Sequence, residues 1–394
     1  MSIRSSRVWL LTLLLAGFCS LSFAQAPQGP ELRVNVQTGG EQGLPEVAMN
    51  ASGEFVVVWS RRDSEADELS LHARRFAADG SPETDEILVH ENVGDSVETA
   101  VAMMEDGSFV VVYAGRSETG SGRITSVLEG RRFAADGAPL GEPFAIGTRR
   151  EAQDPVIAAR PEGGFVVAWE ARREEALEIF VRLFDGDGSP VRDEIPVAAG
   201  NNPAIDVGPE GEIVVVWRER EPGAVGRRYF VALQRLSPDG DREGRRSRVS
   251  NNSTRPLSGI RVAKDRSGSF FVVWAGILWR QGTLGRRFSP DGAPLDQLRL
   301  LDGSELETEI TMAPNGEFFL VWAELEDGLD IFRREFRPSG ARRRKVAQVN
   351  TIRPGDQRAP AVADDGDGNF VVVWESEEPD GSGSGVFARL YRRR

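Results

Sequence analysis

The 394-residue chain contains one cysteine and two histidines, and each scarcity excludes a kind of chemistry. Cys19 has no second cysteine to pair with, so a packed core must stabilise the protein without disulfides. His72 and His90 both lie in predicted strands, which argues against a Ser-His-Asp triad or a histidine metal site. No apolar run is long enough to span a bilayer, so membrane insertion is not expected.

The N-terminus has the three parts of a secretory signal. Arg4 and Arg7 precede an apolar run over residues 8–17, and Ser22-Phe23-Ala24 supplies the small residues of a cleavage site. The pattern predicts a signal peptide over residues 1–24 and a protein exported to the periplasm or the extracellular space.

Acidic residues outnumber basic ones by 61 to 48, which gives a net charge of −13. Nucleic acids and anionic membranes attract basic surfaces, so neither is expected as a partner. Two basic runs, over residues 342–345 and 392–394, are interpreted as solvated edges rather than polyanion sites.

A short apolar segment that ends in an aromatic residue recurs seven times along the chain. The aromatic residues are Trp59, Tyr113, Trp169, Trp217, Trp274, Trp322 and Trp374, spaced 54, 56, 48, 57, 48 and 52 residues apart. An internal repeat of this length indicates a repeat architecture, and we assign residues 25–394 to one domain.

Each repeat predicts four strands. In the second repeat they cover residues 99–103, 108–113, 126–133 and 143–147. The second strand is apolar throughout, so both of its faces should be buried. Tight turns such as Asp106-Gly107 join the first two strands, whereas the loops at the opposite end vary in length and composition. Uniform turns at one end and variable loops at the other are typical of a scaffold that presents a binding face.

The two chain ends predict how the repeats are joined. The segment 32–36 resembles a fourth strand, and the chain closes with a third strand over residues 386–391 that has no fourth strand after it. The N-terminal strand would then complete the last blade and remove the exposed sheet edges. We therefore predict an all-β, seven-bladed β-propeller with four antiparallel strands per blade and a ring closed by the N-terminal strand.

The segment 53–59 (Gly-Glu-Phe-Val-Val-Val-Trp), followed by residues 73–82 (Ala-Arg-Arg-Phe-Ala-Ala-Asp-Gly-Ser-Pro), resembles a repeat of bacterial secreted and surface β-propeller proteins. The last repeat, with Asn369-Phe370-Val371-Val372-Val373-Trp374 and a Gly-Ser-rich segment after it, fits the same pattern. The resemblance covers nearly the whole chain after residue 24. It implies a propeller and an exported bacterial protein, and it implies no catalytic residues.

The seven strand-end aromatics have two interpretations, a ring of sugar-stacking platforms or packing between blades. Their regular spacing and apolar neighbours favour packing. Trp279 lies outside the repeat pattern, on a variable loop; a local loop plug is the favoured interpretation, and a ligand anchor is the alternative that places Trp279 in the candidate binding set.

Charged residues on the variable loops complete the predicted ligand-binding set, although a solvated rim would show the same alternation of charge. The set consists of Trp279, Arg280, Arg61, Arg172, Arg218, Glu324 and Glu375. Asp365–Asn369 alternates oxygen ligands, but it lacks the glycine and glutamate of a calcium loop, so a polar turn is favoured. No metal and no cofactor is expected.

Two functions fit these features. The favoured one is a monomeric, non-catalytic binding or scaffold module that presents its loop face to a protein or glycan. The alternative is a carbohydrate-active hydrolase or lyase that uses paired carboxylates near the central channel. The missing histidine constellation makes catalysis the second choice.

Overall fold

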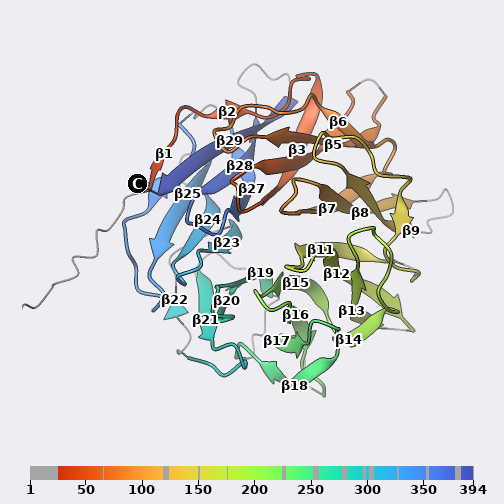
Figure 1. Cartoon of the computed structure of the whole chain (residues 1–394), viewed down its shortest axis with the longest axis vertical. Helices are drawn as coiled ribbons and strands as arrows, with labels where there is room; N and C mark the ends of the chain where they lie inside the picture. Colours follow the sequence, from red (N-terminus) through yellow and green to blue (C-terminus); the bar gives the residue numbers. More distant parts are fainter. Residues whose placement is uncertain are drawn as a thin grey trace, which may run out of the picture.

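The computed structural model describes residues 25–64, 66–118, 124–149, 151–174, 176–223, 228–251, 257–276, 282–295, 299–300, 306–325, 328–351, 355–377 and 383–393. In these ranges the regular elements are β-strands, and no helix there is long and apolar enough to cross a membrane. Figure 1 shows the sheets arranged around a common centre. The fold is an all-β propeller.

Five sheets contain four antiparallel strands each, and each sheet comes from one sequence repeat. The first two are β7 (Ser96–Met103), β8 (Phe109–Glu118), β9 (Ile124–Phe133), β10 (Phe144–Ala145), and β11 (Gln153–Ala159), β12 (Phe165–Arg173), β13 (Ala176–Phe184), β14 (Ile195–Ala199). The third is β15 (Asn201–Val207), β16 (Ile213–Arg220), β17 (Tyr229–Leu236), β18 (Arg242–Arg248). The last two are β19 (Leu257–Lys264), β20 (Phe270–Gly276), β21 (Thr283–Phe288), β22 (Arg299–Leu300), and β23 (Leu306–Met312), β24 (Phe318–Leu325), β25 (Leu329–Phe336), β26 (Ala347–Gln348).

The first and last repeats share one nine-stranded sheet. Its main path is β27 (Gln357–Asp364), β28 (Phe370–Glu377), β29 (Gly383–Arg393), β3 (Gly40–Met49), β4 (Phe55–Arg62), β5 (Leu69–Phe76) and β6 (Ile87–His90). Two N-terminal strands, β1 (Gln25–Pro27) and β2 (Leu32–Arg33), lie antiparallel to β29.

The prediction of seven four-stranded blades in a ring closed by the N-terminal strand is therefore wrong. The described residues form five separate four-stranded blades and the nine-stranded sheet, and backbone ladders do not close the ring. The sheet is continuous because β29 pairs in parallel with β3, with Gly383 opposite Gly40. A Cβ atom on Gly383 would lie 2.5 Å from the carbonyl oxygen of Gly40, so only glycine permits this close backbone approach. The Ser384 hydroxyl also donates to the Gln42 carbonyl oxygen at 2.8 Å.

The second strand of each repeat is buried on both faces, as its apolar sequence predicts. From Phe55 to Trp59 in β4, every side chain is fully buried. In six repeats the first aromatic of this strand stacks on the last aromatic of the third strand, with ring centroids 4.6–4.9 Å apart. This stack holds the two central strands of each repeat together.

The strand-end aromatics pack between repeats, which confirms the structural interpretation of the sequence pattern. Trp169 of β12 packs in one cluster with Val110 and Val112 of β8, and Trp374 of β28 packs with Phe319 and Val321 of β24. Each aromatic thus joins its own repeat to the preceding one. Burial leaves no face of these rings for a ligand.

Arginines in the third strands add polar links between repeats. The first arginine of each Arg-Arg-Phe motif donates to a carbonyl oxygen beside the fourth strand of the preceding repeat: Arg74 to Val34 at 2.9 Å and Arg286 to Val249 at 2.9 Å. The second arginine reaches the following repeat, as Arg287 does to the Pro338 carbonyl oxygen at 2.7 Å. Neighbouring sheets are therefore held by apolar packing and by charged donors on backbone oxygens.

Arg182 of β13 provides a test, because its guanidinium donates to the Ile146 carbonyl oxygen of the preceding repeat at 3.0 Å. We expect Arg182→Met to lower the free energy of unfolding by about 1.5–3 kcal/mol, the range for a hydrogen bond from a charged donor. The matched control is Arg266→Met, because Arg266 is 68% exposed and pairs only at 3.6 Å with Asp367. Equal losses in urea denaturation of the two variants would contradict the role of the inter-repeat arginines.

Candidate functional site

The predicted loop-face residues do not come together in one cavity. Trp279 and Arg280 lie outside the described residues. Arg172 pairs with Glu151 at 2.6 Å, and Arg218 donates to Asn201 at 2.8 Å. These are local contacts at the ends of two different sheets.

The remaining members of the predicted set are equally dispersed. Glu324 accepts a hydrogen bond from the indole of Trp322 at 3.0 Å. Glu375 pairs with Arg358 at 3.0 Å, and Arg61 lies half-buried at the end of β4. Recognition by these residues stays a prediction. Glu375 also accepts a hydrogen bond from the backbone N–H of Leu44 at 3.3 Å, and through this contact it reaches the wall of the cavity described next, which other residues line.

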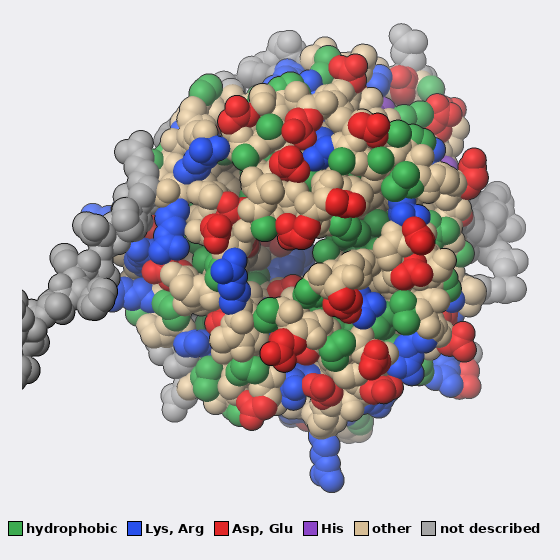
Figure 2. Space-filling view, viewed as in Figure 1, with side chains coloured by type: hydrophobic (Ala, Val, Ile, Leu, Met, Phe, Trp, Pro, Cys, Tyr) green, Lys and Arg blue, Asp and Glu red, His purple; other side chains and the backbone are tan. Residues whose placement is uncertain are grey.

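A cavity of about 830 Å³ occupies one end of the central channel. Its walls come from the innermost strands β3, β7, β11, β15, β19, β23 and β27. The face seen in Figure 2 is hollowed at its centre, and acidic side chains lie around the opening. The volume is in the range of pockets that take drug-sized ligands.

Six of the innermost strands bulge where they line this cavity. The bulged residue has a positive φ near 50°, as in Leu44, Asp154, Asn202, Glu307 and Ala359. A non-glycine residue in this region is strained, so the surrounding contacts must hold it. In four of the six strands a proline follows the bulged residue. Proline has no backbone N–H, but the bulge already interrupts the strand ladder at this point, so the sheet loses no further hydrogen bond. This recurrent proline is the signal in the sequence from which the cavity wall could be predicted.

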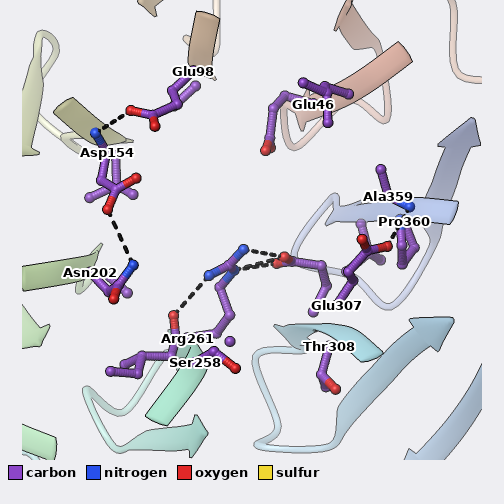
Figure 3. A pocket seen from close by; sticks show the side chains of 18 of the residues that line it. Glu46, Glu98, Asp154, Asn202, Ser258, Arg261, Glu307, Thr308, Ala359 and Pro360 are labelled. Atoms are coloured by element: carbon purple, nitrogen blue, oxygen red, sulfur yellow. Dashed lines mark hydrogen bonds and ion pairs between the residues drawn. The ribbon is translucent and has the colours of Figure 1, made fainter. Parts of the chain in front are cut away.

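Carboxylates from the preceding repeat hold four of the bulges. Glu98 accepts a hydrogen bond from the backbone N–H of Asp154 at 2.6 Å, and Glu307 accepts one from Ala359 at 2.6 Å. Glu170 and Glu375 do the same for Asn202 at 2.7 Å and Leu44 at 3.3 Å. Figure 3 shows the Glu98 and Glu307 contacts on opposite sides of the cavity. The strained backbone is thus fixed by a charge-assisted bond across each repeat boundary.

One position of the innermost strand differs strongly in charge among the repeats. It lies opposite the residue before the strand-end aromatic, and its occupants are Glu46, Ala100, Val156, Ala204, Arg261, Glu309 and Ala361. Four repeats show that a small or branched apolar residue satisfies the fold here. The three charges in the first, fifth and sixth repeats are therefore not required by the scaffold.

Arg261 and Glu309 neutralise each other across two repeats. The Nε of Arg261 lies 2.8 and 2.7 Å from the two carboxylate oxygens of Glu309, and an Nη lies 2.5 Å from Oε1. Such fork-like pairing fixes both side chains at the cavity wall.

Glu46 is left without a hydrogen bond or ion pair among the described residues, and Figure 3 shows its carboxyl group directed into the cavity. Burial raises the pKa of Glu46 to about 8, and repulsion from Glu309 adds to this, whereas Arg261 opposes it. At neutral pH Glu46 is thus a protonated carboxyl group that faces open space.

A second acidic cluster lies at another part of the cavity wall. Burial, followed by repulsion from Asp154, raises the pKa of Glu170 to about 7. Burial and Asp154 likewise raise the pKa of Glu98. The amide of Asn202 donates to Asp154 at 3.2 Å, so part of this cluster is satisfied internally.

Two cavities of the channel share an apolar band of wall residues. Val101, Ile157, Ile205 and Val262 line both the first cavity and a second one of about 520 Å³. In the second cavity Asp364 accepts hydrogen bonds from Thr311 and from the Gly366 N–H, and other polar groups there are similarly paired. Among the described residues, no three His, Cys, Asp or Glu side chains are grouped as a metal site requires.

No family model and no curated protein matches the chain. Solved structures match it over most of its length at low identity. The polysaccharide lyase Uly1 is similar with a TM-score of 0.61 at 9% identity, covering 93% of this chain and 99% of that one. A protein of unknown function from Dyadobacter fermentans has a TM-score of 0.58 at 12% identity, with the same coverage. The β-propeller domain of the Trilobed protease from Pyrococcus furiosus has a TM-score of 0.52 at 8% identity, covering 90% and 95%. At these identities the likeness shows the fold alone.

The raised pKa of Glu46 gives a prediction about stability. Between pH 4.5, the ordinary pKa of a glutamate, and about pH 8, the carboxyl group of Glu46 is protonated in the folded protein and ionised in the unfolded chain. The contribution of Glu46 to stability therefore falls as pH rises through this window. We expect Glu46→Gln to melt a few degrees above the wild type at pH 9 and at the same temperature at pH 5. Asp187→Asn, at a 92% exposed side chain, is the control and should change neither value. A difference in melting temperature between Glu46→Gln and the wild type that stays the same from pH 5 to pH 9 would contradict the assignment of Glu46 as a buried acid.

Proposed function

We propose that the protein is an exported, non-catalytic binding module whose ligand enters the central channel. The supporting observation is the set of charges at Glu46, Arg261 and Glu309, in a strand position where the other repeats have alanine or valine. Charges that a scaffold does not need, lining a cavity of ligand size, are the features of a binding site.

The channel replaces the loop face as the first place to look for the ligand. Its charged residues converge on one space, whereas the described loop residues make scattered contacts, such as Arg172 with Glu151, Glu324 with Trp322, and Arg218 with the Leu257 carbonyl oxygen of the following repeat. The sequence predicts a protein or a glycan as the partner. A chain end or a side group of such a partner would enter the channel. The rest of the partner would then meet the variable loops.

A steric block of the channel tests this proposal. Thr99 of β7 lines the cavity, and Thr99→Trp adds a large side chain there. The wild type is first screened by thermal shift against aliphatic amines, amino-acid amides and neutral oligosaccharides. We expect each compound that raises the melting temperature of the wild type to leave the melting temperature of Thr99→Trp unchanged. Leu140→Trp, at a 41% exposed position outside the cavity, is the matched control and should retain the response. Equal shifts in all three proteins would place the binding site outside the channel.

Catalysis on carbohydrate is the second candidate function. It is favoured by Glu46, whose raised pKa keeps it protonated as a general acid requires, with the carboxylate of Glu309 close enough to raise that pKa further. The similarity to Uly1, a polysaccharide lyase, is consistent with such chemistry in this fold but transfers no residue roles.

A carbohydrate-active enzyme would release reducing ends or unsaturated sugars from a panel of acidic and neutral polysaccharides. Under this candidate function, activity would fall above about pH 8, where Glu46 loses its proton, and Glu46→Gln would lower kcat by at least about 100-fold. Turnover that Glu46→Gln preserves would exclude Glu46 as the acid. Reproducible turnover abolished by the substitution would replace the non-catalytic proposal.

A further inference from the structure

The walls of the central cavity carry an excess of negative charge. Besides the protonated Glu46, the lining includes the acids Glu98, Asp154, Glu307 and Glu309, and Arg261 is the basic side chain among the described ones. An anionic ligand would therefore meet repulsion from several sides. A cation would meet attraction.

The groups that could attract an anion are already occupied. Arg261 is held in its fork-like pair with Glu309. The backbone N–H groups of the bulges, which could otherwise form an anion site, donate to Glu98 and Glu307 at 2.6 Å in two of the repeats. Among the charged side chains of the described lining, the carboxyl group of Glu46 is thus the one without a hydrogen bond or ion pair.

The remaining surface of the cavity is aliphatic. Val101, Ile157, Ile205 and Val262 form the apolar band that this cavity shares with the second one. Leu44 and Leu325 line the cavity as well, and they are 55% and 50% exposed. The described lining contains no aromatic ring on which a sugar could stack, whereas methylene groups fit these walls.

We propose that the central channel binds an alkylammonium group, with its nitrogen on the carboxylate of Glu46 and its methylenes along the aliphatic wall. This inference rests on the proposed function and names its ligand class. Two sources share this chemistry: a free aliphatic diamine and the lysine side chain of a peptide. Both place a point charge with three donors at the end of an apolar stem.

The protonation state of Glu46 links binding to pH. Arg261 and Glu309 are the charged groups that act on Glu46 from the neighbouring strands, and the free protein keeps Glu46 protonated near neutral pH. An ammonium ion favours the ionised form, so binding at pH 7 releases a proton from Glu46. Affinity is expected to rise between pH 6 and pH 9, since less work is then needed to ionise the carboxyl group.

Isothermal titration calorimetry with 1,5-diaminopentane tests the proposal on the purified protein. We expect the wild type to bind the diamine, Glu46→Gln to weaken binding at least tenfold, and Asp187→Asn to leave it unchanged. The control removes the same charge from a 92% exposed side chain on an outer turn. The observed heat at pH 7 should depend on the ionisation enthalpy of the buffer, as proton release requires. 1,5-Pentanediol and glutarate, which match the chain length without the positive charge, should not bind.

A second arm identifies the source of the ammonium group. Tighter binding of Nα-acetyl-lysine amide than of the diamine assigns the site to a lysine side chain, and the reverse order assigns it to a free amine. Either order supports the ligand class.

Failure of this inference can be told apart from failure of the channel proposal. Unchanged diamine affinity in Glu46→Gln, or no diamine binding at millimolar concentration, overturns the alkylammonium assignment. If another probe then binds to the wild type and not to Thr99→Trp, the channel proposal stands without it. If the channel-blocking variant retains every response seen in the wild type, the channel proposal fails as well.

Discussion

Apolar packing between neighbouring sheets is the interaction on which the rest of the propeller depends. Around most of the ring, adjacent sheets share no strand ladder in the described residues, so side chains must hold them together. The second strand of every repeat supplies this contact, because it is buried on both faces and ends in an aromatic that reaches the preceding repeat. The arginines of the third strands then satisfy backbone oxygens that such packing would otherwise bury without a partner.

The seam between the first and last repeats is different. There β29 and β3 come close enough to share backbone hydrogen bonds, because glycine occupies the closest positions on both strands. The two N-terminal strands pair with the same edge of β29 as β3, further along the strand, because β28 occupies the other edge. The result is one wide sheet where the repeat pattern alone would place two blades.

The same packing leaves the innermost strands free to vary. These strands need only a small apolar residue at the position shared by Glu46, Arg261 and Glu309, as the alanines and valine of the other repeats show. Carboxylates such as Glu98 and Glu307 hold the bulged backbone, so the cavity wall keeps its shape regardless of what lines it. A rigid wall with a few charged exceptions is a suitable arrangement for recognising one kind of ligand.

Sequence alone determined the all-β repeat, the burial of the apolar strands and the packing role of the terminal aromatics. These properties follow from the continuous apolar runs of the second strands and from turn residues that recur in each repeat. The merging of the first and last repeats depended on a close approach of residues 40 and 383, which are more than 300 positions apart. Likewise, no sequence pattern links Glu46, Arg261 and Glu309, because their meeting at one cavity is set by the curvature of the whole ring. Only the tertiary structure decided which of the 61 acidic residues face a common space, since contacts between distant strands leave no periodic trace in the sequence.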